Sequence, residues 1–122
     1  MKIREIGKGF NKITIIGVLG RDPEMRYTPD GKPVCTFPMS FNQLGFAENW
    51  KKPTDLEWIN IITSGALAEQ CKETLFKGQY AYVEGQLASR NWNDENGNKH
   101  KTIEIIANEM VILNNLSPLS SE

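Results

Sequence analysis

Residues 35 to 42 alternate strictly between two kinds of side chain, and this pattern restricts the fold more than any other. One face of the segment carries Cys35, Phe37, Met39 and Phe41, and the other carries polar residues and a proline. Successive side chains of a β-strand point to opposite sides, so the pattern predicts a strand with one buried face. We expect these four residues to form a stripe of the core.

Four further segments have the residue types of strands. Residues 12 to 20 are rich in β-branched side chains, and their two glycines predict a bend that lets the strand serve two sheets. Residues 55 to 63 are apolar on both faces, so protein or ligand should cover both. Residues 79 to 92 and 101 to 113 form two longer strands, with Leu87 expected inward. An Asn-Gly pair in the turn between them predicts a hairpin.

Residues 65 to 77 have the periodicity of a helix, because Leu67, Cys71 and Leu75 recur every fourth residue. The order is therefore three strands, a helix and two strands. This predicts an all-β chain, a five-stranded OB-fold Greek-key barrel with one α-helix between strands 3 and 4. We assign residues 1–10 to an N-terminal arm, 11–113 to the OB-fold domain and 114–122 to a short flexible C-terminal tail.

Composition limits the possible functions. The 122 residues fit one domain, and no apolar run approaches the roughly 18 residues of a membrane span. The first residues lack the apolar segment of a signal peptide, so we expect a cytoplasmic protein. One histidine and two distant cysteines predict no metal site and no cofactor, with Cys35 and Cys71 as buried free thiols. The formal net charge of −1 allows nucleic-acid binding only through a local positive surface.

The residue pattern also argues against an enzyme. Gly7-Lys8-Gly9 lacks the spacing of a phosphate-binding loop, and His100 has no nucleophile suggested as its partner. The turn after Trp92 lacks the glutamate that a calcium loop needs at its twelfth position, where Ile103 stands. We therefore expect a binding function.

Five segments in the right order resemble the bacterial single-stranded DNA-binding protein family: residues 11–32, 57–59, 65–69, 82–92 and 93–104. The resemblance implies a homotetramer that coats and protects single-stranded DNA during replication, recombination and repair, within the cytoplasm and associated with the nucleoid. It also implies that the subunit interface includes Tyr80, Tyr82 and Glu84.

Binding of single strands without sequence preference needs aromatic faces for the bases and cations for the backbone. Trp58 and Trp92 match the stacking positions of the family, and strand alternation places both away from the core. The matching cations are Lys12, Arg26, Lys77 and Arg90, to which the hairpin adds Lys99 and Lys101. For Lys99, a solvated surface charge is an equally good interpretation.

The chain departs from the family at several positions. Gly45 and Ser64 stand where the family often has aromatic residues, and Asn60 and Asn91 where it often has cations. We therefore expect weaker and less salt-dependent DNA binding than is usual for the family. A loop with Phe46, Trp50, Lys51 and Lys52 is either a compensating clamp on the DNA or a segment whose aromatic residues anchor it to the protein.

The last residues lack the acidic, hydrophobic tip with which the family recruits replication and repair proteins. Such partners are therefore expected only if a longer acidic tail exists outside this chain. Two alternatives to DNA coating stay open. One is an OB-fold oligomerisation or protein-interaction module with weak or no DNA binding, and the other is an accessory replication protein that binds single strands as a dimer.

Overall fold

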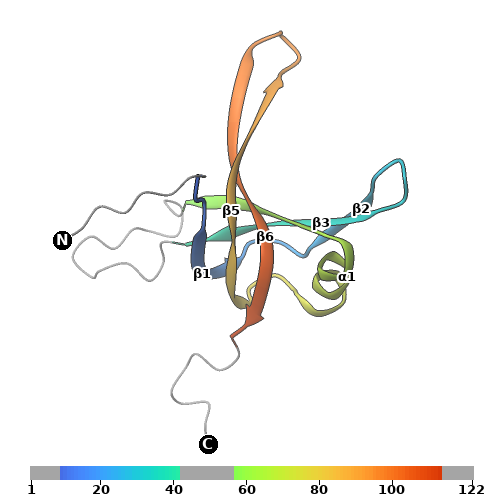
Figure 1. Ribbon diagram of the computed structural model, residues 1–122, viewed down its shortest axis with the longest axis vertical. Helices are drawn as coiled ribbons and strands as arrows, with labels where there is room; N and C mark the ends of the chain where they lie inside the picture. The colour runs from blue at the N-terminus through green and yellow to red at the C-terminus, as the bar shows by residue number, and fades with distance from the viewer. Residues whose placement is uncertain (1–8, 42–56, 114–122) are drawn as a thin grey trace, which may run out of the picture.

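The computed structural model describes residues 9–41 and 57–113. Within these ranges one helix and six strands follow one another as β1 (Ile13–Leu19), β2 (Glu24–Tyr27), β3 (Pro33–Ser40), β4 (Trp58–Ser64), α1 (Gly65–Thr74), β5 (Tyr80–Asn93) and β6 (Lys99–Ile112). The strands form one sheet in the order β1-β5-β6-β4-β3-β2, and an additional pairing of β1 with β3 closes it into a barrel (Figure 1). Helix α1 packs against β2, β3 and β4.

The predicted OB-fold is confirmed, but the helix follows the fourth strand and not the third. The difference comes from residues 24–27, which form a separate strand because Pro23 interrupts the chain after β1. This short strand pairs antiparallel with β3, with Met25 opposite Cys35. The helix is also shorter than predicted, because Leu75 already has an extended backbone that ends the helical hydrogen bonds.

Gly17 allows β1 to pass from one side of the barrel to the other. Strand β1 pairs with β5 from Ile13 to Val18, and Val18 also faces Ser40 of β3. A Cβ atom at position 17 would overlap the carbonyl oxygen of Ser40. The predicted bend in this strand therefore closes the barrel, and only glycine permits the close approach.

The core contains the predicted stripe with one exception. Cys35, Phe37 and Met39 are buried, together with Ile61, Val83 and Ile105 from the facing strands. Phe41 is 40% exposed, so its assignment to the core was wrong: β3 ends at Ser40, and alternation does not reveal where a strand leaves the core.

Both cysteines are buried and free, as predicted. Burial raises the pKa of Cys35, and it raises the pKa of Cys71 to about 11. Each thiol therefore stays protonated at neutral pH and packs as a small apolar group.

The second half of β5 and the first half of β6 extend beyond the barrel (Figure 1). Strand β1 accompanies β5 only as far as Gly85, and β4 pairs with β6 only at residues 104–106. Residues 89–103 therefore pair only with each other, and we call this segment the hairpin ribbon. Leu87, predicted to point inward, is 41% exposed where β5 leaves the barrel.

No helix in residues 9–41 and 57–113 is long and apolar enough to cross a membrane.

Candidate nucleic-acid interface

Trp58 and Trp92 lie on the same outer face of the sheet. Asn60, two residues after Trp58, pairs with Glu104 of β6, and Glu104 pairs with Ala88 of β5. Trp92 is four residues further along β5, and steps of two or four residues stay on one side of a strand. The side chains of Trp58 and Trp92 are 49% and 40% exposed, so both indoles reach solvent from this face.

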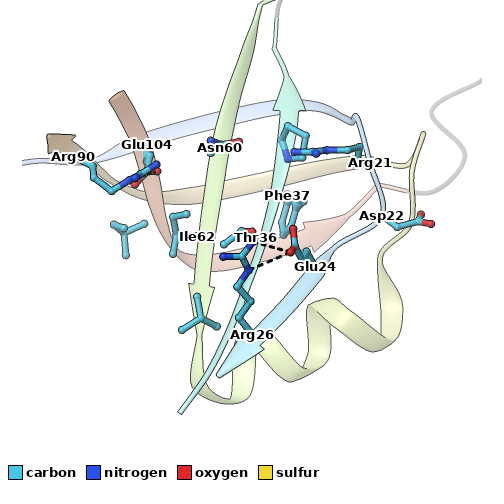
Figure 2. A pocket seen from close by; sticks show the side chains of 13 residues that line it. Arg21, Asp22, Glu24, Arg26, Thr36, Phe37, Asn60, Ile62, Arg90 and Glu104 are labelled. Carbon is cyan, nitrogen blue, oxygen red and sulfur yellow. Dashed lines mark hydrogen bonds and ion pairs between the residues drawn. The ribbon is translucent and has the colours of Figure 1, made fainter. Parts of the chain in front are cut away.

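The same face contains a groove of about 510 Å³ that runs from β2 across β3 and β4 to β5 and β6. Figure 2 shows Arg26 and Glu24 on one side of it, Arg90 and Glu104 on the other, and Asn60 and Ile62 of β4 between them. Arg21 and Asp22 also line the groove. It thus combines polar and apolar floor residues with cations that each have an acidic residue nearby.

The cation on the β2 side forms an exposed ion pair. Arg26 donates from Nη2 and Nε to Oε2 of Glu24, at 2.9 and 3.1 Å. The two side chains are 75% and 57% exposed, and ion pairs in such positions contribute at most about 1 kcal/mol. Arg26 can therefore exchange Glu24 for another anion at little cost.

The cation on the β5 side is held more firmly. Arg90 donates from Nε to Oε2 of Glu104 at 3.2 Å, and the Glu104 side chain is only 10% exposed. A carboxylate with so little access to water needs a cationic partner. Glu104 therefore positions the Arg90 guanidinium at the edge of the groove.

The Trp58 ring packs close to Gly20. A Cβ atom at position 20 would lie 2.5 Å from Cζ3 of Trp58 and 3.1 Å from Cε3. The absence of a side chain at Gly20 thus makes room for the indole, about half of which stays exposed.

Trp92 is held by two residues of β6. Its Nε1 donates to Oγ1 of Thr102 at 2.8 Å, and its ring stacks on the imidazole of His100 with 4.4 Å between centroids and 18° between planes. Trp92 and His100 are directly paired across the hairpin ribbon. The indole is therefore fixed in place although it lies far from the core.

The structure brings only part of the predicted basic set to the groove, namely Arg26 and Arg90. Lys99 and Lys101 alternate with His100 along β6, so they point to the opposite face of the hairpin ribbon from Trp92. Both lysines line a second groove, of about 410 Å³, whose other lining residues are Asn91, Trp92, Asn93 and His100.

The other predicted cations lie elsewhere. Lys12 forms a 3.5 Å ion pair with Glu84 at the beginning of β5, and Lys77 follows α1, with its backbone N–H donating to Oδ1 of Asp22. Neither lysine lines the groove. The predicted loop residues Phe46, Trp50, Lys51 and Lys52 lie outside the described residues.

The first half of β5 carries the predicted interface residues Tyr80, Tyr82 and Glu84. Tyr82 donates from its hydroxyl to Oε1 of Glu84 at 2.8 Å, and this bond raises the pKa of the tyrosine. Tyr82 pairs with Ile16 on one side and Val111 on the other, and both of these aliphatic side chains are 42% exposed. A partly apolar row therefore crosses the outer face of β1, β5 and β6.

Sequence reasoning missed Arg21, Glu24 and Glu104 as groove residues and His100 as the stacking partner of Trp92. The hairpin contained the signal for His100: an Asn96-Gly97 turn that leaves Asn93 opposite Lys99 also leaves Trp92 opposite His100. Among the described residues, no cluster of three or more His, Cys, Asp or Glu side chains could hold a metal ion.

Comparison with known proteins identifies the family of this chain. Residues 10–113 match the single-strand binding protein family. The chain is 43% identical over 110 residues to single-stranded DNA-binding protein 1 of Xylella fastidiosa, covering 85% of this chain and 77% of that protein. It is 39% identical over 104 residues to the single-stranded DNA-binding proteins of Caldanaerobacter subterraneus subsp. tengcongensis and Neisseria meningitidis serogroup A, covering 68% and 60% of them and 85% of this chain. The chain therefore belongs to the single-strand binding protein family.

Proposed function

We propose that this protein binds single-stranded DNA by stacking bases on Trp58 and Trp92 and leading the backbone along the groove between β2 and β5. The observation that carries the proposal is the presence of two exposed indoles on one face of the sheet. Membership of the single-strand binding protein family supports the same ligand.

The geometry suits binding without sequence preference. Every base offers a flat face to an indole, and stacking contributes about 1–3 kcal/mol per base. Arg26 and Arg90 supply cations for phosphates, but Glu24 and Glu104 offset much of that charge. We therefore expect stacking to contribute most of the affinity and salt to weaken binding only moderately.

Such a protein acts by covering exposed strands and not by catalysis. Coating and protecting single strands during replication, recombination and repair is the role that the family resemblance implies. The place of action would be the cytoplasm, on the nucleoid.

We further propose assembly as a homotetramer. The exposed row of Ile16, Tyr82 and Val111 supports self-association, because a second copy would cover its aliphatic surface. Sedimentation analysis tests this: Ile16→Glu should give a smaller species, and Ile103→Glu, an equally drastic change on the hairpin ribbon, should not. A wild-type monomer, or a tetramer unaffected by Ile16→Glu, would contradict the proposed interface.

The DNA-binding proposal is tested by anisotropy titration of labelled oligo(dT) with wild-type protein, Trp58→Ala and Trp92→Ala. Each substitution should weaken binding by about 5- to 150-fold, the equivalent of one stacked base. Phe76→Ala is the matched control, because Phe76 is an exposed aromatic residue that follows helix α1 and is not on β4 or β5, which carry the two tryptophans. Full affinity in both tryptophan variants would refute stacking. No binding by the wild type at low salt would favour the OB-fold interaction module.

A further inference from the structure

We propose that His100 is a positioning residue for Trp92 and, when protonated, a cation of the DNA-binding face, so that single-stranded DNA binding is coupled to proton uptake. This inference rests on the proposed function and adds a regulated component to the same face.

The imidazole covers one side of the indole. The near-parallel stack leaves the other side of Trp92 for a base, and the described residues place no second ring against it. At this point β5 pairs only with β6, so the side of Trp92 away from His100 faces the free edge of the hairpin ribbon. The arrangement makes Trp92 a one-sided platform.

The imidazole is itself held by the hairpin turn. His100 Nε2 lies 2.9 Å from Oδ2 of Asp94, and the histidine side chain is 43% exposed. The other oxygen of Asp94, Oδ1, accepts the backbone N–H groups of Asn96 and Asn98 and so closes the turn. The bond from His100 is the largest of several causes that lower the pKa of Asp94. The Asp94 carboxylate therefore holds the His100 ring in place beside Trp92.

The other charged groups near His100 do not replace it as a titrating cation beside Trp92. On the same face of the ribbon, the next charges are Arg90 and Glu104, which pair with each other. Lys99 and Lys101 alternate with His100 along β6 and line the 410 Å³ groove together with His100 and Trp92, but lysine ordinarily keeps its charge throughout the range in which histidine titrates. Glu95 is in the turn. A phosphate that approaches Trp92 therefore meets His100 as the nearest cation that titrates.

The chain contains one histidine. Histidine is the side chain that ordinarily changes charge between about pH 5 and 8. A bound phosphate stabilises the imidazolium, so oligo(dT) affinity should rise as the pH falls through this range. The gain should be about two- to fivefold, as for an exposed ion pair.

The first measurement follows the single imidazole Cε1–H signal by NMR from about pH 5.5 to 8.5, with and without oligo(dT). DNA should move the midpoint of this titration to higher pH. A midpoint that DNA leaves unchanged, with binding verified by anisotropy in the same samples, would overturn the inference and leave the proposed function intact. If no binding were detected at low salt, the proposed function would fail and the inference with it.

The second measurement separates position from charge by means of His100→Phe and His100→Ala. The phenyl ring keeps the stack but carries no charge, so His100→Phe should lose the gain in affinity at low pH. His100→Ala also removes the backing of Trp92 and should bind more weakly at every pH. If His100→Phe keeps the wild-type pH dependence, or if His100→Ala binds as wild type, the proposed role of His100 is wrong.

Asp94→Asn and Glu95→Gln form a matched pair in the same turn. The asparagine oxygen can still accept the backbone N–H groups of the turn, but the variant has no carboxylate beside His100. Its pH dependence should shift to lower pH, whereas Glu95→Gln should behave as wild type. Equal behaviour of the two variants would contradict the coupling to Asp94.

Discussion

The exposed ion pair between Arg26 and Glu24 leads to a prediction: Glu24→Gln, which removes the negative charge of a groove residue, should strengthen DNA binding. The carboxylate accepts two hydrogen bonds from the guanidinium and offsets its charge where a phosphate would bind. Because both side chains are well exposed, the pair contributes little to the free energy of unfolding. The fold should therefore tolerate the substitution.

The size of the effect follows from Coulomb's law. A carboxylate on the order of 6 Å from a phosphate repels it by about 0.7 kcal/mol at the dielectric constant of water. Glu24→Gln should thus lower the Kd for oligo(dT) by about threefold. If Arg26 then engages a phosphate fully, the slope of log K against log salt should steepen by up to about 0.7.

The assay is an anisotropy titration with oligo(dT) at four or more salt concentrations. Glu69→Gln is the control, because it changes the net charge equally on helix α1 and lies outside the groove lining. Weaker binding by Arg26→Ala but an unchanged Kd and slope in Glu24→Gln would refute the competition by Glu24. Unchanged binding in both variants would remove this groove from the path of the DNA backbone.

Three further predictions follow from other contacts. Gly20→Ala should displace the Trp58 ring and reduce the quenching of its fluorescence by oligo(dT). Binding should weaken by up to the roughly 1–3 kcal/mol of one stack, with little change in melting temperature. Unchanged quenching would contradict the packing of Trp58 on Gly20. Cys35 and Cys71 should react with a thiol reagent only as fast as the chain opens, because both are buried and the pKa of Cys71 is about 11; rapid reaction of the native protein would contradict this. The pKa of Tyr82 is raised, chiefly by its bond to Glu84, so this tyrosine contributes stability that is fully present below about pH 10 and is lost as the pH rises through the folded-state value. Tyr82→Phe should remove that part of the alkaline loss of stability in denaturant titrations, and an identical profile in the variant would refute the assignment.

Local periodicity was enough to predict most of the strands, the helix and the outward direction of both tryptophans. These features depend on residues two to four positions apart, so a single sequence is enough to recognise them. Phe41 and Leu87 were assigned to the core because alternation reports the side of a strand and not where the strand leaves the barrel. The separate strand β2 was missed because its four residues are too few to show a periodicity of their own.

The groove itself could not be predicted. It depends on the parallel pairing of β4 with β6, which joins Asn60 to Glu104 across more than forty positions of sequence. Local rules do not fix such a register. The acidic partner of Arg90 was overlooked for no such reason, because the hairpin register alone brings Arg90 and Glu104 together. The sequence did show that the side chains of Lys99 and Lys101 alternate with His100, the residue opposite Trp92 in the hairpin.

The two tryptophans differ in the mechanical support beneath them. Trp58 lies on the closed barrel, whereas Trp92 lies on a ribbon whose two strands pair only with each other. Two-stranded segments are marginally stable alone, and their amides open at a lower free energy than those of a barrel. Amide hydrogens of residues 89–103 should therefore exchange sooner than those of β3 and β4. One platform is stiff and the other compliant, so the distance between them can adjust to strands whose bases are stacked or spread apart.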